Sequence, residues 1–252
     1  MINTATYRSF FRLVVLMLLS FSLWIFSGSA ANTPQGEKYI PITITKQLEP
    51  ENGVIPVEIR CTEAHITAPN QLEKLDCTLK NNTGKNIIAA SAILSIVVER
   101  DGTISKEASH LTIETLGEQE FKGINKSIGP GEENSLGTSG PTSYLDAVIK
   151  GVEISAGHVE FDDQTTLGDD ETGSQIIRDV REGAAKYKVW LTLKHNGKSV
   201  NGITPLLERD QSLPQELALR NSNQELGAKA YRYRLWKIGH TRGTSEIEKL
   251  LK

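Results

Sequence analysis

The sequence has few of the residues that build most metal and catalytic centres. Among its 252 residues are two cysteines and five histidines, and no two histidines have the His-x-x-x-His spacing of a helical zinc site. The absence of a Walker loop, a Gly-x-Gly-x-x-Gly turn and a Gly-x-Ser-x-Gly elbow argues against nucleotide-dependent enzymes and α/β-hydrolases. We therefore predict no catalytic residue and no cofactor; the alternative is a hydrolase whose site forms in space from acidic residues and scattered histidines. The histidines are His65, His110, His158, His195 and His240.

Neither sign of charge is in excess, and aromatic residues are sparse. The 28 basic and 31 acidic residues leave a net charge of −3, and aromatic residues make up 6% of the chain. A surface that binds nucleic acid needs a strong basic field, often with aromatic side chains on which bases stack. We therefore expect no nucleic-acid partner.

Long hydrophobic runs are also scarce, and the one that could interact with a membrane lies at the N-terminus. Leu13–Phe26 carries no charge, follows Arg8 and Arg12, and precedes the small residues Ser27–Ala31. This run is shorter than the roughly 20 apolar residues of a membrane-spanning helix. We interpret residues 1–31 as a cleaved signal peptide; the alternative is an uncleaved membrane anchor over residues 13–31. Either way the folded part is extracytoplasmic, in the periplasm or secreted.

The two cysteines, Cys61 and Cys77, lie on two strands that are neighbours in the sequence. Each shares the alternation of the apolar residues around it, so both sulfurs point to the apolar face. A hairpin that turns near Pro69 would place them opposite each other, where Cβ atoms are about 4.5–5.5 Å apart. In an exported chain this predicts a disulfide; the alternative is a pair of free buried or metal-binding thiols.

Alternating apolar residues predict a mainly β protein. Residues 32–50 should form a leader and a first edge strand, because Pro41 cannot donate a hydrogen bond to a sheet. Residues 51–168 carry about six to eight short strands separated by turn signals such as Asp101-Gly102, which predicts an antiparallel sandwich. A change of parity at Gly157 predicts a β-bulge.

Helical spacing replaces strand alternation after Gly168 and predicts a helical extension over residues 169–252. The segment Tyr187–Leu193 also alternates, but we expect it to be helical because no turn precedes it. Asn196-Gly197 is a suitable end for this first helix. Pairs of Ser or Thr with Glu or Gln three residues later suggest capping boxes. These pairs are Thr172 with Gln175, Ser212 with Gln215, and Ser222 with Glu225.

Basic and aromatic residues are interleaved in the segment Lys229–Arg242. One interpretation is a basic aromatic patch that faces an anionic surface or an acidic partner. The other, which we expect, is that an apolar stripe packs on the sandwich while the cations stay in solvent. The stripe consists of Leu226, Ala230, Tyr233 and Trp236.

Acidic residues are concentrated between Val159 and Glu171. Carboxylate oxygens are the ligands that calcium prefers, although the spacing does not match an EF-hand loop. Acidic residues also stabilise turns and helix N-termini, so we expect a structural corner here, with a calcium site as the alternative. The candidate metal ligands are Asp162, Asp163, Asp169 and Asp170.

Three segments of the chain carry a resemblance to a known group of proteins. They read LDCTLKNNTGKNIIAASAILSIV, IGPGEE and GVEISAGHVEFDDQTTLGDDETGSQIIRDVREGAAKYKVWL. Over about residues 50–195 the chain resembles uncharacterised exported bacterial proteins with an immunoglobulin-like β-sandwich followed by a C-terminal helix. The resemblance implies that fold and an extracytoplasmic location, and it implies no activity. The chain departs from the group at Gln164, where the group has the Gly of a tight turn.

These features together predict a non-enzymatic binding or structural module of the cell envelope. Its partner would be another envelope protein or a surface ligand, with membrane contact through the N-terminal segment if that segment is uncleaved. The alternatives are the hydrolase and the calcium-stabilised sandwich described above.

Overall fold

The computed structural model describes residues 37–115, 127–137, 141–195, 204–208 and 211–251. The predicted signal peptide over residues 1–31 and the predicted helix end at Asn196-Gly197 lie outside the described residues. Among the helices that are described, none is long and apolar enough to cross a membrane.

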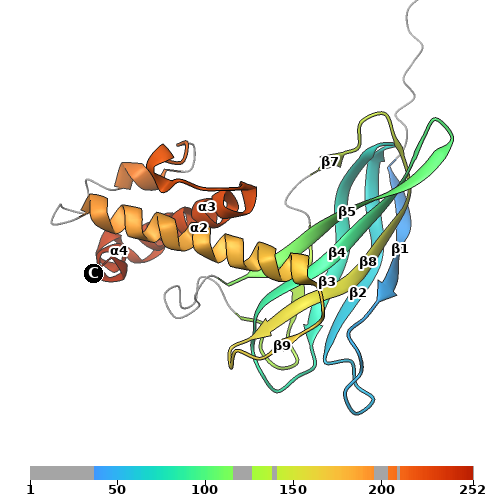
Figure 1. Cartoon of the computed structure of the whole chain (residues 1–252), viewed down its shortest axis with the longest axis horizontal. Helices are drawn as coiled ribbons and strands as arrows, with labels where there is room; N and C mark the ends of the chain where they lie inside the picture. The colour runs from blue at the N-terminus through green and yellow to red at the C-terminus, as the bar shows by residue number, and fades with distance from the viewer. Residues whose placement is uncertain (1–36, 116–126, 138–140, 196–203, 209–210, 252) are drawn as a thin grey trace, which may run out of the picture. The chain divides into compact units, whose positions relative to one another are not determined.

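The strands of the described chain form one sheet that curls into half of a barrel (Figure 1). Their order is β5-β4-β8-β1-β2-β3-β6, with β7 paired to β3 and β9 to β8. The mainly β prediction, with helices at the C-terminus, is confirmed. The strands are β1 (Lys38–Lys46), β2 (Val57–Ala68), β3 (Gln71–Asn81), β4 (Ile87–Arg100), β5 (Thr103–Glu114), β6 (Glu133–Ser135), β7 (Thr142–Ser143), β8 (Val148–Phe161) and β9 (Thr166–Leu167).

Strand β1 changes partner halfway along its length. Its first half pairs antiparallel with β2 as far as Pro41, and its second half, from Ile42, pairs parallel with β8. The sheet is therefore not wholly antiparallel, and β1 lies inside the strand order rather than at its edge. Each half of β1 nevertheless has a neighbour on one side only, so Pro41, which has no N–H group, interrupts no second ladder.

Two local predictions for the strands are confirmed. Asp101 and Gly102 both have positive φ, 49° and 76°, and join β4 to β5 in a tight hairpin. At Gly157 the register between β4 and β8 shifts, because Ala90 pairs with Val159 while Ala92 pairs with Ala156. Two residues of β8 therefore lie opposite one residue of β4, which is the predicted β-bulge.

The predicted disulfide is also confirmed. Cys61 and Cys77 are cross-strand partners on β2 and β3, with Cα atoms 4.1 Å apart and a sulfur–sulfur bond of 2.08 Å. The alternative of two free thiols is therefore wrong.

The concave side of the sheet holds one apolar core. Inward-facing residues of β1, β2, β3, β4 and β8 belong to a single cluster, and several are almost fully buried. Each large aliphatic side chain buried in this way stabilises the fold by about 1.5–3 kcal/mol relative to its exposed state. Among the most buried are Ile59, Leu72, Leu79, Ile96 and Ile154.

The helical extension has a core of its own. The segment Tyr187–Leu193 is helical, as predicted, and Tyr187 and Leu191 are fully buried together with Leu235 and Ile238. The hydroxyl of Tyr187 donates to the carbonyl of Leu206 at 2.9 Å, and burial raises the pKa of this phenol to about 12. The helices are α2 (Glu171–His195), η2 (Thr204–Leu207), η3 (Gln215–Leu217), α3 (Ser222–Arg242) and α4 (Thr244–Leu250).

Helices α2 and α3 approach each other closely at two glycines. A Cβ atom on Gly183 would lie 1.9 Å from the Gln224 carbonyl oxygen, and one on Gly227 would lie 1.8 Å from that of Val180. Only glycine allows backbones to approach so closely.

The predicted docking face of α3 is wrong. Leu226 and Tyr233, expected to pack on the sandwich, are 53% and 44% exposed, whereas Ala228, Tyr231 and Leu235 are buried. The buried side of α3 is the one that carries Gly227. This glycine lets α3 cross α2 closely, so the face that contains it packs against α2.

Candidate functional site

The acidic run between Val159 and Glu171 does not gather into one site. Asp162 accepts hydrogen bonds from the backbone and side-chain amides of Asn86, at 3.4 and 2.7 Å. Asp163 forms an ion pair with Lys85 at 2.7 Å. Among the described residues, no group of three or more His, Cys, Asp or Glu side chains is arranged to hold a metal ion.

Two of the candidate metal ligands, Asp163 and Asp169, are each paired with a lysine. The hydrogen bond from Lys85, helped by those from Thr165, lowers the pKa of Asp163 to about 2. The hydrogen bond from Lys46, at 2.9 Å, lowers the pKa of Asp169. Both side chains are well exposed, so these pairs contribute little to stability.

Asp170 differs, because its side chain is only 8% exposed and lies where the sheet meets α2. One oxygen accepts from the backbone N–H of Gly173 at 3.0 Å, which caps the helix. The other accepts from the hydroxyl of Ser91 at 3.0 Å, and Nε2 of His110 lies 3.3 Å from both oxygens. Burial raises the pKa of Asp170, but these hydrogen bonds and the nearby imidazole outweigh it and leave the pKa lowered.

Ser91, His110 and Asp170 are the residue types of a hydrolase triad, but they meet in a different order. A nucleophilic serine needs a base on its hydroxyl, usually a histidine that a carboxylate orients. Here the carboxylate lies between the two, and Ser91 Oγ also accepts from the backbone N–H of His158 at 2.8 Å. Ser91 is 1% exposed. This geometry joins a helix to a sheet and forms no nucleophile–base pair.

The backbone is also closely packed at this junction. A Cβ atom on Gly173 would lie 2.1 Å from Ser91 Oγ and 2.2 Å from Asp170 Oδ2. The first turn of α2 can therefore reach the sheet only with glycine at this position.

Arg181 makes a second connection between α2 and the sheet. Its guanidinium lies 2.6 Å from Glu160 on β8 and 2.8 Å from Glu114 on β5. Glu160 also lies 3.2 Å from Nε2 of His158. Burial lowers the pKa of Arg181, but the two carboxylates outweigh it, so the pKa is raised. With Asp170 and Arg181 both engaged, α2 is held to the sheet at two points three turns apart.

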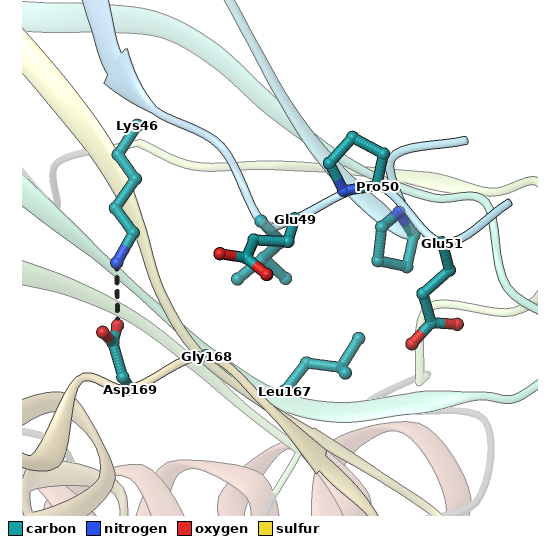
Figure 2. Close-up of a pocket in the computed structure, with 9 residues that line it drawn as sticks. Lys46, Glu49, Pro50, Glu51, Leu167, Gly168 and Asp169 are labelled. Atoms are coloured by element: carbon teal, nitrogen blue, oxygen red, sulfur yellow. Dashed lines mark hydrogen bonds and ion pairs between the residues drawn. The ribbon is translucent and has the colours of Figure 1, made fainter. Parts of the chain in front are cut away.

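A groove of about 410 Å³ opens where β1 ends (Figure 2). The Lys46–Asp169 pair bounds one side of it, and Glu49 lies between that pair and Glu51. It adjoins a hollow of about 440 Å³ that shares Pro56 and Leu167 with it. The charged side chains that line the groove and the adjoining hollow are exposed, and they include both cations and anions. Neither cavity therefore presents a buried charged group that could fix a ligand.

A third groove, of about 590 Å³, lies along α3 and is richer in apolar side chains. Tyr233 stacks on Trp236 with ring centroids 5.8 Å apart. The ring centroids of Trp236 and His240 are 4.1 Å apart. Arg232 donates to the carbonyl of Gln211 at 2.7 Å and so holds the opposite wall. We call this the α3 groove; its lining residues are Leu207, Gln211, Ser212, Leu226, Lys229, Ala230, Arg232, Tyr233 and Trp236.

Sequence reasoning missed the junction of Ser91, His110 and Arg181. The only local indication was a serine within an apolar strand, opposite the bulge at Gly157. His110 and Arg181 are 60 and 11 residues from Asp170, and no spacing rule connects positions that meet only through the sheet.

Comparisons with protein-family models, with curated proteins and with solved structures give no match to this chain.

Proposed function

We propose that this protein is an exported, non-enzymatic binding module of the cell envelope. In this proposal the sheet is a scaffold, and the helical extension carries the recognition surface. The observation that carries it is the α3 groove. Leu226 and Tyr233, which line this groove, are exposed to solvent, whereas the opposite face of α3 is buried. Concave surfaces lined mostly by apolar and aromatic side chains are common binding sites.

The polar interior supports binding rather than catalysis. Asp170 and Arg181 are engaged in attaching α2, and Ser91 donates to a carboxylate whose pKa is lowered. None of these side chains lines any of the three grooves described above. A buried attachment of this kind keeps the helical extension in a fixed orientation for a partner.

Two features support an extracytoplasmic location. The apolar run Leu13–Phe26 is followed by small residues, as in a signal peptide. The Cys61–Cys77 disulfide is compatible with an oxidising compartment. Fractionation should find the chain outside the cytoplasm, with a mature N-terminus near residue 31 or 32 by N-terminal sequencing; retention in the cytoplasm would contradict export.

We further propose that the curled sheet is a variant of the immunoglobulin-like sandwich. Strands that switch between sheets form the corners of such folds, and β1 changes its partner from β2 to β8 between Pro41 and Ile42. The two halves of the sheet also share one apolar core. An experimental structure with two packed sheets would support this, and a flat open sheet would reject it.

Photo-cross-linking in living cells tests the binding function. A photoreactive residue at Leu226, in the α3 groove, should give a discrete cross-linked product. The matched control is Leu193 on α2, which is 69% exposed and lies outside the groove. Equal products at both positions, or none at Leu226, would reject the α3 groove as the recognition surface.

A further inference from the structure

The α3 groove has the dimensions of a ligand site. At about 590 Å³ it lies within the range of roughly 300–1,000 Å³ that ligand pockets occupy. One wall is the outward face of α3, and the other comes from the segment around Leu207, Gln211 and Ser212. The groove is concave, so it fits an inserted side chain better than the surface of a bilayer.

The apolar wall is suited to holding a large side chain. Tyr233 and Trp236 stack with an interplanar angle of 16°, and Leu226 lies two turns before Tyr233 on the same side of the helix. Aromatic side chains offer large contact areas and lose little conformational entropy on binding. Tyr, Trp and Arg are also the residues that most often dominate binding energy.

The charge of α3 selects the sign of the partner. Three cations of Ser222–Arg242 reach solvent, Lys229, Lys237 and Arg242, against one exposed carboxylate, Glu225. Arg232 and Arg234 are buried, and each donates to a backbone carbonyl. Of the three cations that reach solvent, Lys229 lines the groove itself, where the buried Arg232 is engaged with the carbonyl of Gln211. Glu225 lies 3.6 Å from Lys229 in a pair whose two side chains are more than half exposed, so it offsets only part of this charge.

We infer that the α3 groove binds an acidic peptide segment of another envelope protein, in which carboxylates flank a large apolar side chain. This inference rests on the proposed binding function and adds the chemistry of the partner. The apolar side chain enters between Leu226 and Tyr233, and a flanking carboxylate lies near the exposed Lys229. Complementary charge of this kind speeds association and selects against basic partners.

The test uses the full chain and three fluorescein-labelled peptides of equal length. The first has a central Phe-Leu pair flanked by Asp and Glu, the second has Lys at the acidic positions, and the third has Ala in place of Phe and Leu. Fluorescence anisotropy should show that the first binds at least about tenfold more tightly than either of the others. Its affinity should fall as the salt concentration rises.

Variants locate the binding to the groove. Leu226→Ala and Tyr233→Ala change exposed residues, so the fold should survive, and each should weaken binding of the acidic peptide about tenfold. Leu193→Ala should leave binding unchanged. Lys229→Gln should weaken it several-fold and reduce its salt dependence, whereas Lys249→Gln on α4, outside the groove, should do neither.

Three results would overturn the inference. They are equal binding of the acidic and basic peptides, no binding of the acidic peptide up to millimolar concentrations, and an affinity that Leu226→Ala and Tyr233→Ala leave unchanged. Binding to vesicles of phosphatidylglycerol and phosphatidylethanolamine without binding to the acidic peptide would assign the groove to a lipid surface instead. A cross-link at Leu226 in cells without a preference for the acidic peptide would retain the binding function and reject only this partner chemistry.

Discussion

The sheet and the helical extension differ in how they expose apolar side chains. On the long strands the exposed large apolar residues are isolated: Tyr39, Ile104 and Val148 each lie within the first two residues of their strand. On the helices they occur in pairs on one face, with Leu226 and Tyr233 two turns apart on α3. The pair on α2 is Val189 and Leu193, one turn apart.

This difference fits the separate roles that we propose for the two regions. Isolated apolar residues at strand ends are ordinary on protein surfaces and need no explanation. The pair on α3 borders a groove that a partner can fill, whereas Val189 and Leu193 on α2 line none of the three grooves described above. In the proposed function the sheet serves as a support, and the helical extension carries the surface for recognition.

Removing the disulfide should have the largest effect and should act on the sheet. The double variant Cys61→Ala, Cys77→Ala opens a loop with a sequence separation of 16, and the free energy of unfolding should fall by about 3 kcal/mol in the chain-entropy model. Urea titration measures this fall. Hydrogen exchange should accelerate in β2 and β3 far more than in α3. Equal acceleration in the sheet and in α3 would show that the two regions unfold as one cooperative unit.

Crowding the helix crossing should act on the helical extension instead. Gly227→Ala places a Cβ atom 1.8 Å from the carbonyl oxygen of Val180, so the free energy of unfolding should fall by about 1–3 kcal/mol. The fluorescence of Trp190 and Trp236, which lie on α2 and α3, monitors the change. Gly84→Ala is the control, since no atom lies within 4 Å of its added Cβ; a similar loss there would show that the crossing is not the cause.

Acid should weaken the junction between the two regions through Asp170. Its pKa is lowered in the folded state, so its contribution is present above the unfolded value of about 3.9 and is lost as the pH falls through the folded value. At pH 7, Asp170→Asn should lower the free energy of unfolding by about 1–2 kcal/mol, because a cap and a buried acceptor are weakened.

The difference between wild type and Asp170→Asn should shrink as the pH falls below about 4. Urea titrations at several pH values measure it. Asp76→Asn removes a carboxylate that pairs with Lys74 while more than half exposed, and this control should change stability little at any pH. If the difference in free energy of unfolding between wild type and Asp170→Asn is the same at every pH, the charge of Asp170 does not stabilise the junction.

The smallest effect should come from the turn between β8 and β9. Gln164 has a φ of +70°, a conformation that glycine adopts without the penalty of a side chain. Gln164→Gly should therefore raise the melting temperature, by an amount equivalent to about 0.5 kcal/mol. Thr166→Gly, on the neighbouring strand, has no positive φ to relieve and should lower it. Calorimetry distinguishes the two outcomes.

Much of the sheet could be predicted from the sequence because its determinants are local. Alternation identified the strands, and the shared parity of Cys61 and Cys77 identified their cross-strand pairing. The turn at Asp101 and the bulge at Gly157 followed from residue chemistry alone. Pairing between distant strands has no such local pattern, so the parallel pairing of β1 with β8 was missed.

The helical extension was less predictable, because the close crossing of α2 and α3 over its apolar core depends on Gly183 and Gly227. All three predicted capping boxes were misplaced: Asp170 and Asn221 cap α2 and α3, and Pro214 precedes η3 without a side-chain cap. The regular spacing of Leu226 and Tyr233 was real, but it marked the exposed face of α3. A crossing set by Gly227 leaves no apolar pattern in the sequence for periodicity to detect.

The change of partner by β1 makes one of its two ladders depend on a strand far along the chain. Ile44 pairs with Ile154, 110 positions further along the chain, whereas the β2–β3 hairpin needs only contacts within about 25 residues. In a chain delivered from its N-terminus, the hairpin and its sulfur bridge can form early, while the second half of β1 waits for β8. The sheet is thus completed when β8 pairs with the second half of β1. In a chain truncated before β8, the backbone hydrogen-bonding groups of that half of β1 would be open to other molecules.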